Sequence, residues 1–132
     1  MSARDEIERT LYRFARGFDE DDFALLAETM TSDVELTSFE GATLGREAVL
    51  EMLRGRRDDA GADGSRPRHL LGNVEIDVES DSAASARCAY ALFSAGPAGV
   101  DTVSVGTYGD SFVNDRGTWR INRRYVNVDR PD

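Results

Sequence analysis

The chain has 132 residues and carries 25 acidic against 16 basic side chains, which gives a net charge of −9. This length is enough for one core, and we expect a single domain over residues 1–132. Hydrophobic residues make up 40% of the chain, which argues against disorder. The acidic charge repels polyanions, so nucleic acid is not an expected partner.

Cysteine and histidine are each used once, as Cys88 and His69. A single cysteine excludes an internal disulfide and fits a reducing compartment, so we expect a cytoplasmic protein. A structural zinc ion needs about four Cys or His ligands, so no metal is expected. No apolar run approaches the roughly 20 residues of a membrane span, and the charged start, residues 1–6, does not resemble a signal peptide.

Apolar residues at helical spacing predict an amphipathic helix over residues 3–18, with Phe14 and Phe18 on its apolar stripe. The acidic residues in the first turn of this helix suit the positive end of the helix dipole. An acidic run follows at residues 19–22, and one of its aspartates is expected to be the N-cap of a second, short helix.

The next segments predict one strand and one further helix. Residues 33–39 alternate between polar and apolar like a strand, and a turn is expected between Gly41 and Gly45. A third helix is predicted from about Arg46 to Arg54. The polar, glycine-rich residues 55–66 then predict a mobile loop. This loop lies directly before His69, where a lid would be useful.

The second half of the chain is rich in strand patterns. Short turns join neighbouring strands, which implies an antiparallel meander, and helices followed by strands indicate an α+β fold. The predicted strands are residues 67–79, 84–95, 101–114 and 117–128.

The last strand carries apolar residues on both faces. Strict alternation places Trp119, Ile121 and Tyr125 on one face, and Val126 and Val128 on the other. A sheet that is apolar on both sides needs two covers. The helices supply one cover, and we expect a second copy of the chain to supply the other, so a homodimer is predicted.

Several segments, taken together, carry a family resemblance: Tyr12–Asp19 with Asp22 and Phe23, Met30–Val34, Gly45–Ala48, Arg68–Asn73 and Gly117–Ile121. In this order, over about residues 4–128, they resemble the SnoaL-like branch of the nuclear transport factor 2-like superfamily. That branch includes polyketide cyclases and is similar to scytalone dehydratase, bile-acid dehydratase and ketosteroid isomerase. The resemblance implies an α+β cone, in which a strongly bent mixed or antiparallel sheet wraps around about three helices and encloses a pocket.

The resemblance also implies a catalytic pair. In dehydratase-like members an aspartate after the first helix and a histidine at this strand start line the pocket, and these positions match Asp19 and His69. The sequence departs from scytalone dehydratase because it has no second histidine. Phe14 and Phe18 fall where some relatives carry a pocket tyrosine.

Both residues also have a structural interpretation. An aspartate before a short helix is often a helix cap, which would account for Asp19. Strict alternation places His69 on the same face as the polar Glu75 and Asp77, away from the core. A bulge near Gly72 would reverse this facing.

Aromatic and polar side chains are the candidates for the pocket wall. The aromatic candidates are equally typical of an ordinary core, and the polar pair, which shares a face with Tyr125, is equally typical of a solvated face. The predicted substrate-binding residues are Phe14, Phe18, Tyr90, Tyr108, Phe112, Arg123 and Asn127.

These observations predict a dehydratase, isomerase or cyclase that acts without a cofactor on a hydrophobic, polycyclic or polyketide-like carbonyl compound. Such chemistry needs one group that removes a carbon-bound proton and one that protonates an oxygen, and an Asp–His pair can divide these duties. Two alternatives stay open. One is a non-catalytic binding or dimerisation module, and the other is a small subunit of a ring-hydroxylating dioxygenase, which shares this architecture.

Overall fold

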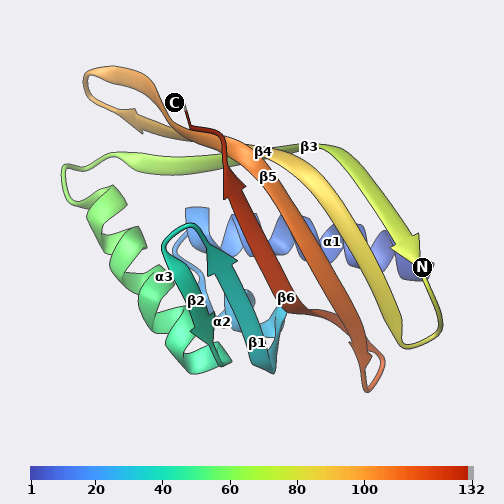
Figure 1. The fold of residues 1–132 in the computed structure, drawn as a ribbon. Helices are drawn as coiled ribbons and strands as arrows, with labels where there is room; N and C mark the ends of the chain where they lie inside the picture. Colours follow the sequence, from blue (N-terminus) through green and yellow to red (C-terminus); the bar gives the residue numbers. More distant parts are fainter. Residues whose placement is uncertain (131–132) are drawn as a thin grey trace.

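The computed structural model describes residues 1–130 as three helices packed against a six-stranded sheet (Figure 1). The order of strands in the sheet is β2-β1-β6-β5-β4-β3. The helices are α1 (Ala3–Asp19), α2 (Phe23–Glu28) and α3 (Arg46–Gly61), and the strands are β1 (Met30–Ser38), β2 (Gly41–Leu44), β3 (Arg66–Val78), β4 (Ala83–Gly96), β5 (Gly99–Asp115) and β6 (Thr118–Val128).

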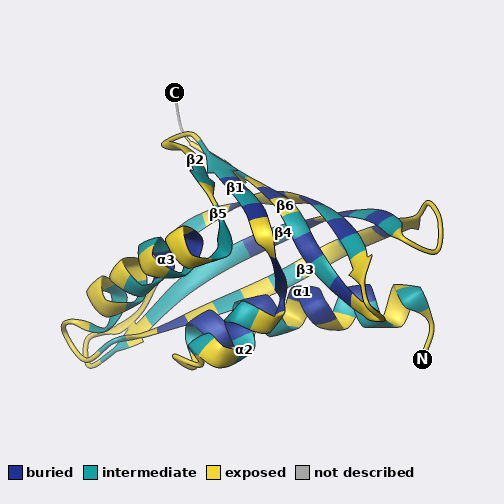
Figure 2. Ribbon diagram, turned by 90° about the horizontal axis from the view of Figure 1, so that it is seen from below, coloured by how far each residue is buried: buried dark blue, intermediate teal, exposed yellow. Residues whose placement is uncertain are grey.

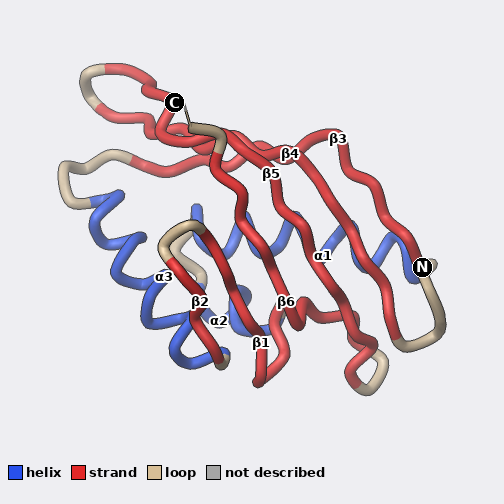
Figure 3. Tube along the Cα trace, in the orientation of Figure 1, coloured by secondary structure: helices blue, strands red, loops and turns tan. Residues whose placement is uncertain are grey.

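The predicted α+β class and the meander are confirmed. Strands β3 to β6 pair antiparallel in chain order, whereas β1 pairs with β6 in parallel, so the sheet is mixed. All three helices lie on one side of the sheet (Figure 3). In Figure 2 the strands arch over α1, with α3 beside it, and the buried residues lie between helices and sheet. The sheet is bent but does not close.

Helix α1 forms as its apolar stripe and its caps predict. Ser2 accepts the Asp5 N–H at 3.1 Å in a capping box, and the stripe from Ile7 to Phe18 is buried. Helix α2 packs closely against the C-terminal end of α1. A Cβ added at Gly17 of α1 would lie only 3.1 Å from the Leu26 Cβ of α2. No helix among residues 1–130 is long and apolar enough to cross a membrane.

A bulge in β3 decides which way His69 faces. The pairing with β4 shifts by one residue between Gly72 and Glu75, and Asn73 adopts a left-handed φ of 51°. The extra residue moves His69 and Ile76 onto the same, inner face of the sheet. The structure thus has a bulge near Gly72, which reverses the facing that strict alternation gives His69.

A second bulge corrects the facing predicted for β6. The pairs Ser111–Arg123 and Phe112–Ile121 leave Asn122 as an extra residue. Before the bulge Ile121 points inward, and after it Arg124 points inward while Tyr125 is 50% exposed. The prediction that Tyr125 shares a face with Ile121 is therefore wrong, because strict alternation does not hold across a bulge.

Two local predictions are also wrong. Residues 41–44 form the short strand β2 and not only a turn, since they pair with the end of β1. Residues 55–61, predicted as part of a mobile loop, continue helix α3. Arg57 accounts for the longer helix, because its guanidinium donates to the Phe18 carbonyl at 2.9 Å and ties α3 to the end of α1.

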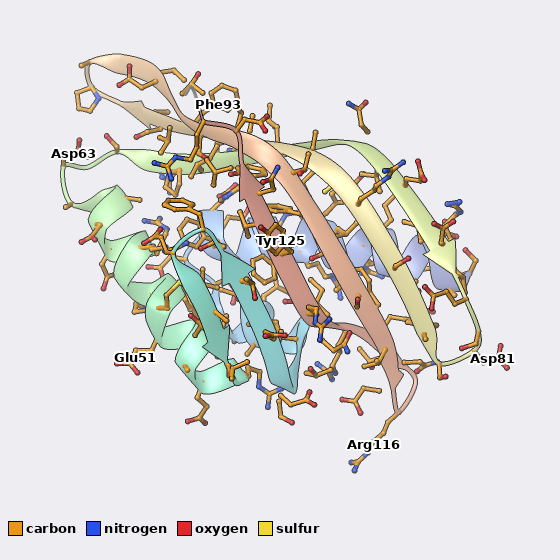
Figure 4. All side chains as sticks on the ribbon, in the orientation of Figure 1. Glu51, Asp63, Asp81, Phe93, Arg116 and Tyr125 are labelled. Atoms are coloured by element: carbon orange, nitrogen blue, oxygen red, sulfur yellow. The ribbon has the colours of Figure 1, made fainter. Side chains whose placement is uncertain are left out.

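The outer face of the sheet carries apolar side chains without a cover. Leu70, Ala91 and Val105 are neighbours across β3, β4 and β5, and both Leu70 and Val105 are exposed. Tyr125 lies on β6 on the side away from α1 (Figure 4). We still expect a homodimer, with this uncovered face of the sheet as its interface.

We expect sedimentation velocity at micromolar concentration to give a dimer, and Val105→Glu to shift it to monomer by placing a charge in the interface. Val100→Glu is the matched control, because Val100 is also an exposed valine of β5, at 68% against 40% for Val105, but lies near the β4–β5 turn. A monomer for the unmodified protein, or equal effects of both variants, would contradict this interface.

Candidate active site

A cavity of about 620 Å³ lies between the concave face of the sheet and helices α1 and α3. Its wall is mainly aromatic and aliphatic, with a few polar groups. The lining includes Phe14, Phe18, Leu53, His69, Tyr90, Leu92, Ser104, Tyr108, Arg124 and Val126.

The side chains of Asp19 and His69 meet at the edge of this cavity, although 50 residues separate them. His69 Nδ1 lies 2.7 Å from Asp19 Oδ1, and the His69 backbone N–H donates to Asp19 Oδ2 at 2.7 Å. Both side chains are largely buried, with 13% of His69 and 7% of Asp19 exposed. The structure therefore brings the two predicted residues together.

Each partner is positioned by its own element. Asp19 is the last residue of α1, and Arg57 of α3 donates to its carbonyl at 3.3 Å. His69 is turned inward by the β3 bulge, and the edge of its ring meets Phe18 with 5.4 Å between the centroids. Asp19 is not the cap of α2, because Asp22 takes that role and accepts the Leu25 N–H.

This geometry determines which imidazole nitrogen is available. Both carboxylate oxygens of Asp19 accept from N–H groups of His69, so the neutral ring carries its proton on Nδ1. The lone pair on Nε2 then lies on the side of the ring away from Asp19. His69 lines the cavity but Asp19 does not. Asp19 instead borders a second pocket of about 280 Å³, which His69 lines as well.

The predicted wall residues divide into two groups. Phe14, Phe18, Tyr90 and Tyr108 line the cavity. The other three do not reach it, and their expected contact with a substrate is corrected: Phe112 is buried in the core at 1% exposure, Arg123 is exposed and pairs with Glu35 at 3.2 Å, and Asn127 is exposed on the outer face. The bulge at Asn122 explains the last two.

A buried ion pair, of which Arg124 lines the cavity, was not predicted from the sequence. Arg124 Nε and Nη2 donate to the Asp110 carboxylate at 2.7 and 3.1 Å, and both side chains are almost fully buried. Burial favours a lower pKa for Arg124, but the charge and hydrogen bonds of Asp110 outweigh it and raise the pKa. One signal was present: Asp110 has the parity of Tyr108 and Phe112, and an inward carboxylate needs a partner.

Burial also determines the protonation of two neighbours of this pair. Desolvation raises the pKa of the Cys88 thiol to about 11, so it stays protonated at neutral pH. Desolvation likewise raises the pKa of Tyr108, which keeps its hydroxyl as a hydrogen-bond donor. Tyr90 stacks on Tyr108 with 4.4 Å between ring centroids, and its hydroxyl pairs with Ser104 at 2.8 Å.

The model of the SnoaL-like domain matches residues 1–125. The chain belongs to the SnoaL-like family. No curated protein matches it. The SnoaL-like fold is thus shown both by the family match and by the structure.

Solved structures agree with this fold. A variant of Rv3472 from Mycobacterium tuberculosis, a protein of unknown function, is 27% identical, with a TM-score of 0.82 over 96% of this chain and 71% of that one. A nuclear transport factor 2-like protein from Novosphingobium aromaticivorans is 26% identical, with a TM-score of 0.84 over 95% and 80%. A candidate scytalone dehydratase from the same organism is 22% identical, with a TM-score of 0.82 over 96% and 84%.

Arg57 is expected to matter for stability because it satisfies two carbonyls at the end of α1. Arg57→Ala should lower the free energy of unfolding by about 1–3 kcal/mol, measured by urea denaturation. The matched control is Arg56→Ala, which removes only an exposed ion pair with Glu40 and should cost at most about 1 kcal/mol. Equal losses for the two variants would show that Arg57 does not anchor α1.

Proposed function

We propose that this protein is a cofactor-independent dehydratase, isomerase or cyclase that acts on a hydrophobic cyclic carbonyl compound. The observation that carries the proposal is the orientation of His69. Asp19 lies 2.7 Å from Nδ1, Nε2 has no hydrogen-bond partner among residues 1–130, and the residue lines a largely apolar cavity. The volume of the cavity, about 620 Å³, is in the range of pockets that take drug-sized ligands.

The proposed reaction needs only one residue to move protons. Nε2 of His69 removes a proton from the carbon next to the carbonyl, and the electrons of the C–H bond pass to the carbonyl oxygen as an enolate. Asp19 stabilises the imidazolium that forms. In a dehydration the enolate re-forms its carbonyl, the neighbouring C–O bond breaks, and His69 returns the proton to the leaving hydroxyl as water.

An open cavity with a polar pair at its edge favours an enzyme over a binding module, whose pocket would be filled or would lack such a pair. The candidate scytalone dehydratase with the same fold supports dehydration among the three reactions. A polyketide-like substrate, action in the cytoplasm and a homodimer remain parts of this proposal. The largely apolar wall is consistent with such a substrate.

The proposal predicts turnover of a cyclic β-hydroxy ketone. We suggest 3-hydroxy-1-tetralone, whose loss of water gives 1-naphthol, with absorbance of the naphthol as the readout. Exchange of the α-protons of 1-tetralone in D2O, followed by NMR, reports proton removal alone. His69→Gln should lower either rate by about 10²–10⁴-fold, because it removes the base.

Asp19→Asn should be similarly damaging, and the double variant should be little worse than either single one because the two residues act together. Arg68→Gln is the matched control, since Arg68 precedes His69 on β3 but does not line the cavity. Unchanged rates in His69→Gln would reject the role of His69. Absence of both dehydration and exchange with a panel of such ketones would reject the enzyme.

A further inference from the structure

Arg124 occupies an unusual position for a charged side chain. It is 2% exposed, and what remains accessible lies at the cavity, which Arg124 lines. Its guanidinium lies between two aromatic rings, 4.2 Å from the centroid of Phe14 and 4.0 Å from that of Tyr108. Asp110 holds it from the third side. These three groups hold the guanidinium in one place.

The hydrogen bonds of Arg124 are incomplete. Nε and Nη2 donate to Asp110, and within residues 1–130 no acceptor is bonded to Nη1. Nη1 is also not among the buried, unpaired nitrogens of this part of the chain, so it keeps access to the cavity. The Tyr108 hydroxyl is in the same position, since it has no partner within these residues and Tyr108 lines the cavity. Two donors are therefore left for a ligand.

Helix α1 sets the spacing between these donors and His69. Phe14 packs on Arg124, and Phe18 meets the ring of His69. The two phenylalanines are four residues apart on one helix, which corresponds to about 6 Å along its axis. Arg124 and His69 therefore pack against successive turns of α1 and line the same cavity.

We propose that Arg124 and Tyr108 form the oxygen-binding end of the cavity, and that this end selects an uncharged planar ring ketone or phenol. The ring would lie in the apolar cavity between these donors and His69. Its oxygen would accept from Nη1 of Arg124 and from the Tyr108 hydroxyl. One part of this inference rests on the proposed function: the oxygen becomes charged only when His69 removes a proton from the ligand.

Charge explains the preference for an uncharged ligand. Asp110 already balances the charge of Arg124, so a bound carboxylate would add an uncompensated negative charge to a buried site. An enolate differs, because its charge appears together with the positive charge on His69. The preorganised donors then stabilise the charge as it forms. The site thus suits an oxygen that is neutral when it binds.

Binding of 1-naphthol, 1-naphthoate and naphthalene, measured by fluorescence or calorimetry, tests this proposal without any turnover. The unmodified protein should bind 1-naphthol at least about tenfold more tightly than either of the other two. Tyr108→Phe should weaken naphthol binding several-fold and leave naphthalene binding unchanged. Tyr12→Phe is the matched control, because Tyr12 does not line the cavity and its hydroxyl donates to Glu8 at 2.8 Å.

A second variant tests Arg124 without leaving a buried charge alone. The double variant Arg124→Gln with Asp110→Asn removes both charges and should weaken naphthol binding by about tenfold or more. Arg123→Gln is its control, because Arg123 lies on the outer face and is exposed. Circular dichroism and the melting temperature establish that each variant folds, and Tyr108→Phe carries the test if the double variant does not.

The outcomes separate this proposal from the proposed function. Tighter binding of 1-naphthoate than of 1-naphthol would overturn it in favour of a carboxylate site. Naphthol binding no tighter than that of naphthalene, or no naphthol binding up to about 1 mM, would also overturn it. Selective naphthol binding that His69→Gln leaves intact, with no turnover of any ketone, would instead support the oxygen-binding end and reject the enzyme.

Discussion

The carboxylate of Asp19 is the group on which the site depends. It accepts both the backbone N–H and the ring N–H of His69, and so fixes the end of α1 to the start of β3 and the imidazole to one orientation. The same carboxylate therefore connects two elements of the fold and positions the proposed base. Asparagine would not reproduce this arrangement, because its NH2 group would face one of the two N–H donors of His69. Arg57 supports the arrangement from α3 by binding the carbonyls of Phe18 and Asp19.

Two bulges determine which side chains reach the cavity. The bulge at Gly72–Asn73 turns His69 inward while keeping Ile76 in the core. The bulge at Asn122 places Ile121 in the core and, three residues later, Arg124 at the cavity. In each strand one extra residue changes which side chains face the helices, and so brings His69 and Arg124 to the cavity. Bulges commonly serve to redirect side chains next to functional sites.

Much of the fold was predictable because its signals are local. The apolar stripe of α1, the Asp22 cap of α2 and the alternating strands with short turns each depend on neighbouring residues. The pairing of Asp19 with His69 was predicted from the family resemblance. The length of α3 was missed because contacts of Arg57 with α1 outweigh the glycines of residues 55–61.

The oxygen-binding residues were not predictable in the same way. The pair of Asp110 and Arg124 depends on the register of β5 against β6, which the bulge at Asn122 shifts. The same shift places Arg123 and Asn127 on the outer face. Strict alternation had placed them on the same face as Trp119 and Ile121, which are buried. Strand alternation read from a single sequence does not show where a bulge falls.

The central claim is that Asp19 holds the proton of neutral His69 on Nδ1 and leaves Nε2 free toward the cavity. Nitrogen-15 NMR of the imidazole ring tests this directly, because His69 is the only histidine and gives one pair of ring signals. We predict a protonated Nδ1 and an unprotonated Nε2 in the neutral ring, with the Nε2 signal moving when a ligand enters the cavity. A neutral ring protonated on Nε2, or two tautomers in the proportions of free imidazole, would contradict the account.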